Sequence, residues 1–167
     1  MENVSQEKQT AAVCGLLCKS CVIYIATKEK NTALLNRIAG SLQLTKEQVQ
    51  CQGCRSNVLS GHCQVCHFRA CSINKEIEFC SECNEYPCPQ LKEFQTKMPH
   101  RVELFKSLDR IKEAGWEKWY AEIVSRHSCT KCNTLNSWYE FACRSCGNKP
   151  PNCFIADNFN ILSTYKK

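Results

Sequence analysis

Three cysteines near the start of the sequence, Cys14, Cys18 and Cys21, are spaced C-x3-C-x2-C in the stretch C-G-L-L-C-K-S-C. Thiolates are soft ligands that suit zinc ions and iron–sulfur clusters. Three close cysteines and a distant fourth can hold a [4Fe–4S] cluster, and the same three can also belong to a zinc site. The surrounding residues must therefore be considered to distinguish a zinc site from an iron–sulfur cluster.

The chain has 16 cysteines in 167 residues, and most of them occur as C-x2-C pairs. Such a tight turn directs two thiolates toward one metal ion, about 2.3 Å from each sulfur when the ion is zinc. Residues 1–10 carry no apolar run like that of a signal peptide, and no stretch approaches the length of a membrane span. We therefore expect a cytoplasmic protein without membrane contact, in which reduced thiols bind metal and form no disulfides. The pairs are Cys18/Cys21, Cys51/Cys54, Cys63/Cys66, Cys80/Cys83, Cys129/Cys132 and Cys143/Cys146.

The clearest motif is C-T-K-C at 129–132 followed by C-R-S-C-G at 143–147. Two such turns joined by the strand-like run W-Y-E-F-A (138–142) predict a zinc ribbon with short β-strands. Four thiolates around one ion form a closed set with no position for water or substrate, which is typical of structural zinc. A redox dithiol would use a single C-x-x-C beside a βαβ pattern, so the paired turns argue against it. A rubredoxin-like iron site uses the same four sulfurs and stays open.

Eleven further cysteines lie between residues 14 and 88, and one histidine would complete twelve ligands for three tetrahedral sites. We favour His62, directly before Cys63, with His67 and His100 as alternatives. One partition joins the pairs at 51/54 and 63/66 and leaves Cys14, Cys18 and Cys21 with a fourth ligand from elsewhere. Interleaved pairings are equally compatible with the spacing. The remaining site in this partition contains Cys71, Cys80, Cys83 and Cys88.

The expected cofactors are about three Zn²⁺ ions in the N-terminal region and one in the ribbon, with a [4Fe–4S] cluster at Cys14, Cys18 and Cys21 as the alternative. Cys153 is expected to be a free thiol. The expected metal ligands are Cys14, Cys18, Cys21, Cys51, Cys54, His62, Cys63, Cys66, Cys71, Cys80, Cys83, Cys88, Cys129, Cys132, Cys143 and Cys146.

Helical patterns surround the cysteines. We expect a short helix after Cys21, a helix over about 31–42, and one further turn opened by a capping box at T-K-E-Q (45–48). Pro89 and Pro99 can each open a helix. An apolar stripe from Leu104 to Val124 predicts one helix with a weak point at Gly115, or two shorter helices. Regular structure within 51–88 should be short.

The resulting fold class is mainly α, small and metal-stabilised. The apolar fraction of 43% includes the 16 cysteines, so ordinary hydrophobes are about a third of the chain and metal ions should replace part of the core. The expected organisation is a flexible tail (1–10), a cysteine-rich multi-zinc domain (11–98), an amphipathic helical segment packing on it (99–127), a zinc ribbon (128–153) and a C-terminal tail (154–167).

The formal charge of +6 would suggest a nucleic-acid partner, but it treats every thiol as neutral. Fifteen thiolates on four Zn²⁺ ions contribute a net −7 and leave the holoprotein at −1, because the charge of each bound ion counts. We therefore expect a protein partner. Trp138 and Tyr139, if exposed, could contact a protein or a single strand of nucleic acid, although ribbon packing explains them equally.

Four stretches occur in one order with characteristic gaps: C-G-L-L-C-K-S-C-V-I-Y (14–24), C-Q-G-C (51–54), G-H-C-Q-V-C-H-F-R-A-C (61–71) and C-S-E-C-N-E-Y-P-C-P-Q-L (80–91). Together they resemble the cysteine-rich, presumed zinc-binding domain-of-unknown-function family 3795 (DUF3795), found mainly in anaerobic bacteria and archaea. The resemblance spans roughly residues 12–125, and I-K-E-A-G-W-E-K-W (111–119) followed by a ribbon is similar to longer members. It implies metal binding at the matched cysteines and His62, and no established reaction. Phe68 stands where the family pattern has an aliphatic residue.

Radical-SAM enzymes share the C-x3-C-x2-C spacing, but their cluster sits at the mouth of a β/α barrel with alternating strands and helices. Here the residues between Cys21 and Cys51 read as helical. The favoured function is a non-catalytic zinc protein that presents a surface to a partner. An iron–sulfur or redox protein is the alternative. A metal store fits less well, because a reservoir does not need the helical stripes at 31–42 and 102–124. A catalytic zinc ion held by Cys14, Cys18 and Cys21 also fits less well, because no partner acid or base is evident in the sequence.

Overall fold

A computed structural model describes residues 2–165, with side chains from residue 6 onward. This part of the chain is mainly helical and has no β-strand; its isolated bridges join Ala11 to Leu17 and Ser128 to Leu135. None of its helices combines the length and apolar character that crossing a membrane requires. The α-helices are α1 (Glu2–Thr10), α2 (Val22–Lys28), α3 (Thr32–Leu42), α4 (Lys46–Val49), α5 (Gly61–Gln64), α6 (His67–Asn74), α7 (Pro89–Thr96), α8 (Leu104–Ala114), α9 (Trp116–His127) and α10 (Cys153–Leu162).

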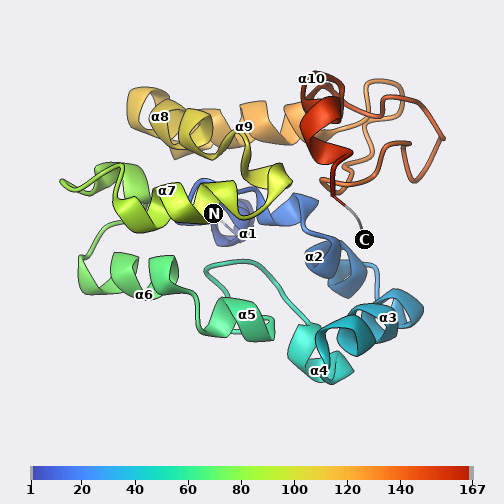
Figure 1. Ribbon diagram of the computed structural model, residues 1–167, viewed down its shortest axis with the longest axis horizontal. Helices are drawn as coiled ribbons and strands as arrows, with labels where there is room; N and C mark the ends of the chain where they lie inside the picture. The colour runs from blue at the N-terminus through green and yellow to red at the C-terminus, as the bar shows by residue number, and fades with distance from the viewer. Residues whose placement is uncertain (1, 166–167) are drawn as a thin grey trace.

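The helices lie in tiers (Figure 1). In that view α8 and α9 run along the top, α7 crosses the middle, and α3 to α6 lie below. The cysteine-rich loops connect the lower helices, while α10 and the irregular segment before it lie at one end. Short 3₁₀ turns at Cys18–Ser20, Cys80–Glu82 and Pro99–Arg101 complete the regular structure of the described residues.

Local sequence signals set several helix boundaries. The side chain of Asn31 accepts a hydrogen bond from the backbone N–H of Leu34 and caps α3. Thr45 and Gln48 form both hydrogen bonds of the expected capping box at α4. Pro89 occupies the first turn of α7, where its missing N–H costs nothing. The predictions of these helices, and of short elements within 51–88, are confirmed.

The apolar stripe over 104–124 forms two helices that separate at Gly115. α8 buries Leu104, Leu108 and Ile111, and α9 buries Trp119 and Ile123. Both helices pack on the N-terminal segment Ala11–Leu17. The cysteine-rich part and the helical segment therefore share one core.

This core is more extensive than the composition suggested. Its buried members include Leu17, Phe79 and Leu91 besides the residues of α8 and α9, and each such side chain contributes about 1.5–3 kcal/mol when fully buried. Several cysteines pack against its edge, among them Cys18 and Cys54. Cys14 is itself a buried member of this core, so the expectation that metal ions replace part of the core stays a prediction.

The N-terminal segment expected to be a flexible tail is helical as α1 over its described residues; Met1 lies outside them. Contacts to distant residues hold this polar helix in place. Lys8 Nζ lies 2.7 Å from the carboxylate of Glu78 and 4.3 Å from the ring centroid of Trp116. Thr10 is buried and its hydroxyl hydrogen-bonds that of Tyr120. The expectation failed because long-range contacts, absent from local composition, stabilise the helix.

The expected C-terminal tail (154–167) is also corrected, since most of its described residues belong to α10. Phe154, Ile155 and Leu162 are buried in a satellite cluster. Arg126 of α9 connects this helix to the rest by bonding both Glu103 and Asp157. Residues 166–167 lie outside the described part of the chain.

The zinc-ribbon segment contains no β-strand within the described residues, so the prediction of short strands is wrong for this part of the chain. The run at 138–142 forms turns and bends. Trp138 and Tyr139 are half-buried: Trp138 stacks on His100 at a ring-centroid distance of 4.2 Å, and the hydroxyl of Tyr139 lies 2.8 Å from His100 Nδ1. These aromatic residues therefore pack against a distant part of the chain and do not belong to a strand pair.

A glycine substitution tests how closely α1 contacts the cysteine-rich loops. Gly53 has φ +113°, and a Cβ there would lie 2.5 Å from the carbonyl oxygen of Gln9. We expect Gly53→Ala to lower the free energy of unfolding by about 2–4 kcal/mol in urea titrations with zinc present. The matched control is Gly40→Ala in α3, where the added methyl meets nothing within 4 Å; it should raise stability by about 0.5–1 kcal/mol. Equal effects of the two substitutions would contradict this packing.

Candidate metal centres

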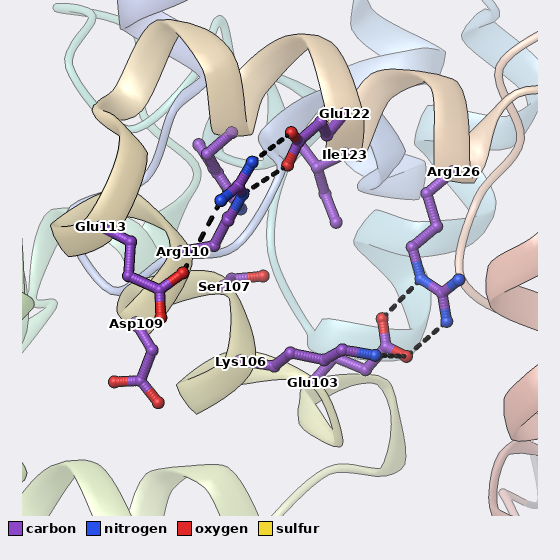
Figure 2. Close-up of a pocket in the computed structure, with 10 residues that line it drawn as sticks. Glu103, Lys106, Ser107, Asp109, Arg110, Glu113, Glu122, Ile123 and Arg126 are labelled. Atoms are coloured by element: carbon purple, nitrogen blue, oxygen red, sulfur yellow. Dashed lines mark hydrogen bonds and ion pairs between the residues drawn. The ribbon is translucent and has the colours of Figure 1, made fainter.

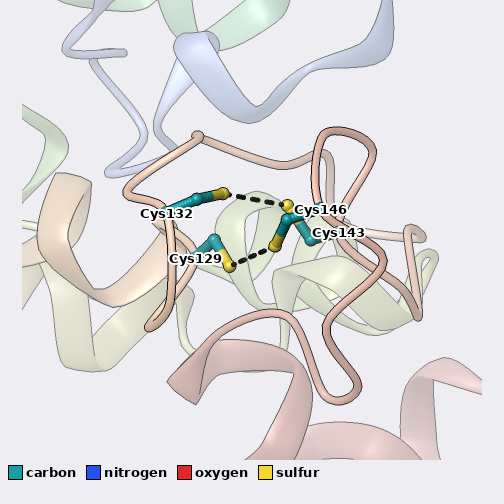
Figure 3. A group of neighbouring side chains, drawn as sticks. All are labelled: Cys129, Cys132, Cys143 and Cys146. Atoms are coloured by element: carbon teal, nitrogen blue, oxygen red, sulfur yellow. Dashed lines mark hydrogen bonds between the residues drawn. The ribbon is translucent and has the colours of Figure 1, made fainter.

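The sulfur atoms of Cys129, Cys132, Cys143 and Cys146 all lie within 4.8 Å of one another (Figure 3). The distances from Cys129 to Cys146 and from Cys132 to Cys143 are both 3.6 Å. A disulfide would need about 2.05 Å. A tetrahedral ion bound at about 2.3 Å from each sulfur would separate the sulfurs by about 3.8 Å. The four thiols therefore have the spacing of a mononuclear, tetrahedral metal site.

The two C-x2-C turns of this site repeat the same backbone hydrogen bonds. In the first, Cys129 N–H bonds the carbonyl of Thr134, and Asn133 N–H bonds the carbonyl of Cys129. In the second, Cys143 N–H bonds the carbonyl of Asn148, and Gly147 N–H bonds the carbonyl of Cys143. Asn133 and Gly147 both adopt positive φ, at 57° and 73°.

In both turns, each sulfur is approached by the backbone N–H group of the residue two positions later. Lys131 N–H donates to Cys129 Sγ at 3.4 Å, as Ser145 N–H donates to Cys143. Likewise, the N–H of Thr134 is directed at the sulfur of Cys132, and that of Asn148 at the sulfur of Cys146. Such donors stabilise thiolates, which are the form that binds metal. The residues present fit a bound cation.

The pKa values of these thiols reflect their crowding. Hydrogen bonds from the hydroxyl and the N–H of Thr134 lower the pKa of Cys132 to about 6. The N–H of Asn148 favours the Cys146 thiolate, but the neighbouring thiols outweigh it and raise its pKa to about 11. Four thiolates cannot coexist at these distances without a compensating cation, and a divalent ion would supply that charge.

Two buried asparagines, which sequence analysis did not single out, hold this segment in position. Asn136 Oδ1 accepts the N–H of Arg144, which follows Cys143. Asn152 caps α10 and donates its amide N–H to the carbonyl of His127 at the end of α9. Nothing in the sequence indicated this role, because asparagines are also common at protein surfaces.

Among the described residues, the N-terminal cysteines do not form a comparably closed group, with three or more ligand atoms within 4.8 Å. Cys71, Cys80, Cys83 and Cys88 nevertheless line one cavity of about 280 Å³, as the sequence-based partition grouped them. Burial and the thiols of this group raise the pKa of Cys80 to about 12. Lys75 Nζ lies 3.3 Å from Cys83 Sγ and 2.9 Å from Glu85, so a positive charge adjoins these thiols.

Contacts among the other cysteines do not follow the expected pairing of the turns at 51–54 and 63–66. The thiols of Cys51 and Cys63 are close enough to interact, which raises the pKa of Cys51 and lowers that of Cys63. Cys54, by contrast, interacts with Cys66 and with the N–H of Val13. The two cysteines of each turn therefore have different neighbours.

The histidines differ in their surroundings. His62 lies at the surface beside Ser60, with 3.4 Å between its Nδ1 and the Ser60 hydroxyl, and it is near enough to Cys51 for that thiol to favour its charged form. His67 is exposed against Phe68. His100 is engaged by Trp138 and Tyr139, and burial lowers its pKa to about 3. His62 is therefore near Cys51 of another turn, and His67 lines the cavity that Cys80, Cys83 and Cys88 also line.

Three arginines that sequence analysis did not single out surround the thiols next to Cys54. Arg69 Nε donates to the carbonyl oxygen of Cys54 at 3.1 Å, and Arg55 Nε donates to that of Ala11 at 3.1 Å. Both guanidinium groups lower the pKa of Cys54 against the larger effect of burial. Arg101, whose Nε is buried without a partner, interacts with the thiols of Cys14 and Cys66. These arginines are far apart in the sequence, so nothing in the sequence indicated that they lie near the same thiols.

A groove of about 400 Å³ between α8 and α9 is lined mostly by charged residues (Figure 2). Arg110 forms two hydrogen bonds with Glu122, at 2.8 and 2.6 Å. Arg126 pairs with Glu103 in the same groove. These charges neutralise one another, and no cysteine is among the lining residues described. The groove therefore belongs to the helix packing and not to the metal chemistry.

The fold and the site define a small, mainly helical, cysteine-rich protein with a group of four thiols that can hold a metal ion. The chain belongs to the family described as "Protein of unknown function (DUF3795)", whose model matches residues 10–93, half of the sequence. The match ends within α7, so α8, α9 and the four-thiol group lie outside it. Searches of curated proteins and of solved structures gave no match.

The repeated turn geometry of the four-thiol group can be tested at its two positive-φ residues. An alanine at Gly147 meets nothing within 4 Å, so only the left-handed backbone opposes it. We expect Gly147→Ala to lower the free energy of unfolding by about 1–2 kcal/mol in urea with zinc present. Asn133→Gly, at the equivalent position, should leave stability unchanged or raise it. A Gly147→Ala variant as stable as the unsubstituted protein would show that this backbone turn is not required.

Proposed function

We propose that this protein is a non-catalytic zinc protein, in which structural ions fix the cysteine-rich loops and thereby shape a surface for a protein partner. The observation that carries the proposal is the four-thiol group at 129–146, with its mononuclear spacing and its repeated N–H to sulfur hydrogen bonds. All four protein ligands are present, so no coordination position is left for water or substrate.

Zinc suits this set better than an iron–sulfur cluster does. The cysteines of a four-iron cluster bind four different irons, which keeps their sulfurs farther apart than those around a single ion. The described residues also contain no strand from which the β/α barrel of a radical-SAM enzyme could be built. These observations favour structural zinc over radical-SAM chemistry.

A protein partner is part of the proposal. The metal-corrected charge near −1 gives little electrostatic attraction for nucleic acid. The aromatic residues that could have stacked on bases, Trp138 and Tyr139, are engaged with His100. Exposed apolar side chains such as Val65 and Ile73, 83% and 61% exposed, offer contacts of the kind that proteins use.

Chelation tests the structural role of the ions. Zinc sites contribute about 10–16 kcal/mol each in finger peptides, which rivals the roughly 5–15 kcal/mol stability of a whole domain. We expect a strong chelator under reducing conditions to abolish most of the helical far-UV circular dichroism, and added zinc to restore it. The thiols must be kept reduced, because oxidation would prevent the recovery.

The informative control is to add the chelator already saturated with zinc, which should leave the spectrum unchanged. A fully metal-free protein that keeps its native spectrum and thermal transition would refute a structural role for the ions.

A further inference from the structure

We propose that the eight ligands between Cys14 and Cys66 form two interleaved metal sites, so that each cysteine turn supplies both. This inference rests on the proposed zinc function and specifies the sites that carry it. Site A contains Cys14, Cys18, Cys54 and Cys66. Site B contains Cys21, Cys51, His62 and Cys63.

The turn at 51–54 lies between two different parts of the chain. At one end, Cys51 N–H donates to the hydroxyl of Thr27 at 3.1 Å, which places Cys51 beside α2, the helix that Cys21 caps. At the other end, Arg55 N–H donates to the carbonyl of Gln9 at 3.2 Å, which places Cys54 beside the segment leading to Cys14. The first and second cysteines of this turn therefore face different partners.

Site A is assembled around Cys54. Its sulfur accepts the N–H of Val13, the residue before Cys14, and its own N–H points at the sulfur of Cys18. Its carbonyl accepts from Arg69 of α6, the helix that Cys66 caps. Cys14 is buried in the core cluster, and Cys18, Cys54 and Cys66 pack against the same cluster, so these side chains share one region.

Site B is assembled around Cys51. Its sulfur accepts the N–H of Gly53 at 3.4 Å, and its thiol interacts with that of Cys63. Cys51 also interacts with Cys21, whose sulfur accepts N–H groups from the first turn of α2. His62 precedes Cys63 and is close to Cys51. A histidine at this position would complete three thiolates as a Cys₃His set.

The distribution of charge agrees with this division. Four thiolates around a divalent ion leave site A with a net charge of −2, whereas three thiolates and a neutral histidine leave site B with −1. Arg55 and Arg69 lie beside Cys54 of site A, and Arg101 interacts with Cys14 and Cys66 of site A as well as with His62 of site B. Buried ionic groups require such compensation. The more negative of the two sites is thus the one near which all three arginines lie.

Zinc counting on paired variants separates interleaved from sequential sites. Native mass spectrometry of the full chain, after equilibration with a chelator of moderate affinity, reports zinc ions per molecule. The variant Cys51→Ser/Cys54→Ser should lose two zinc ions, because it damages both sites. The variant Cys14→Ser/Cys54→Ser should lose only one. Cys153→Ser, at an exposed cysteine outside every proposed site, is the control and should lose none.

The opposite pattern, one ion lost from Cys51→Ser/Cys54→Ser and two from Cys14→Ser/Cys54→Ser, would overturn the interleaving while leaving the zinc function intact. An unsubstituted protein that binds no zinc would overturn both.

A measurement without substitutions covers the case in which a variant fails to fold. In the cadmium-113 form of the unsubstituted protein, proton–cadmium correlations should connect the cysteines of site A to one ion and those of site B to another. Correlations that join Cys51 and Cys54 to a single ion would contradict the proposal.

Discussion

The crowding of thiols at sites that water reaches poorly is the constraint on which the rest of this structure depends. Burial raises the pKa values of Cys14, Cys18 and Cys21, and neighbouring thiols raise them further. Backbone N–H groups are nevertheless directed at several of these sulfurs, that of Leu16 at Cys14 and that of Ile23 at Cys21, an arrangement that favours thiolates. A bound cation resolves this conflict, because it neutralises the thiolates that the N–H groups stabilise. The loops at 129–146 have the conformation that metal binding requires, although little regular secondary structure holds them.

The hydrophobic core and the proposed metal sites have complementary roles. α8 and α9 pack on the segment 11–17 and form a hydrophobic core with it. The cysteines at the edge of that core extend this order into loops too short and polar to bury much apolar area. Site A would lie where the two meet, since Cys14, Cys54 and Cys66 all contact the core cluster. Loss of metal at this point would therefore affect helices that contain no ligand.

How much the sequence predicts depends on the range of the interactions involved. Local signals were sufficient for α3, α4 and α7, for the separation of α8 from α9 at Gly115, and for the cysteine turns at 129–146. They failed for α1 and α10, whose stability comes from distant partners such as Glu78 for Lys8 and Arg126 for Asp157. Ligand spacing alone could not assign neighbours either, because Cys51 and Cys54 are three residues apart yet face different parts of the chain.

The central proposal is that the thiols of this chain bind mononuclear zinc ions. Its most direct test is elemental analysis, with absorption spectroscopy, of protein purified without oxygen. We predict about four zinc ions per chain, no iron or acid-labile sulfide, and no visible absorption. Stoichiometric iron and sulfide with a broad band at about 400 nm would contradict the claim in favour of a cluster. Metal-free protein with its cysteines paired as disulfides would contradict it altogether.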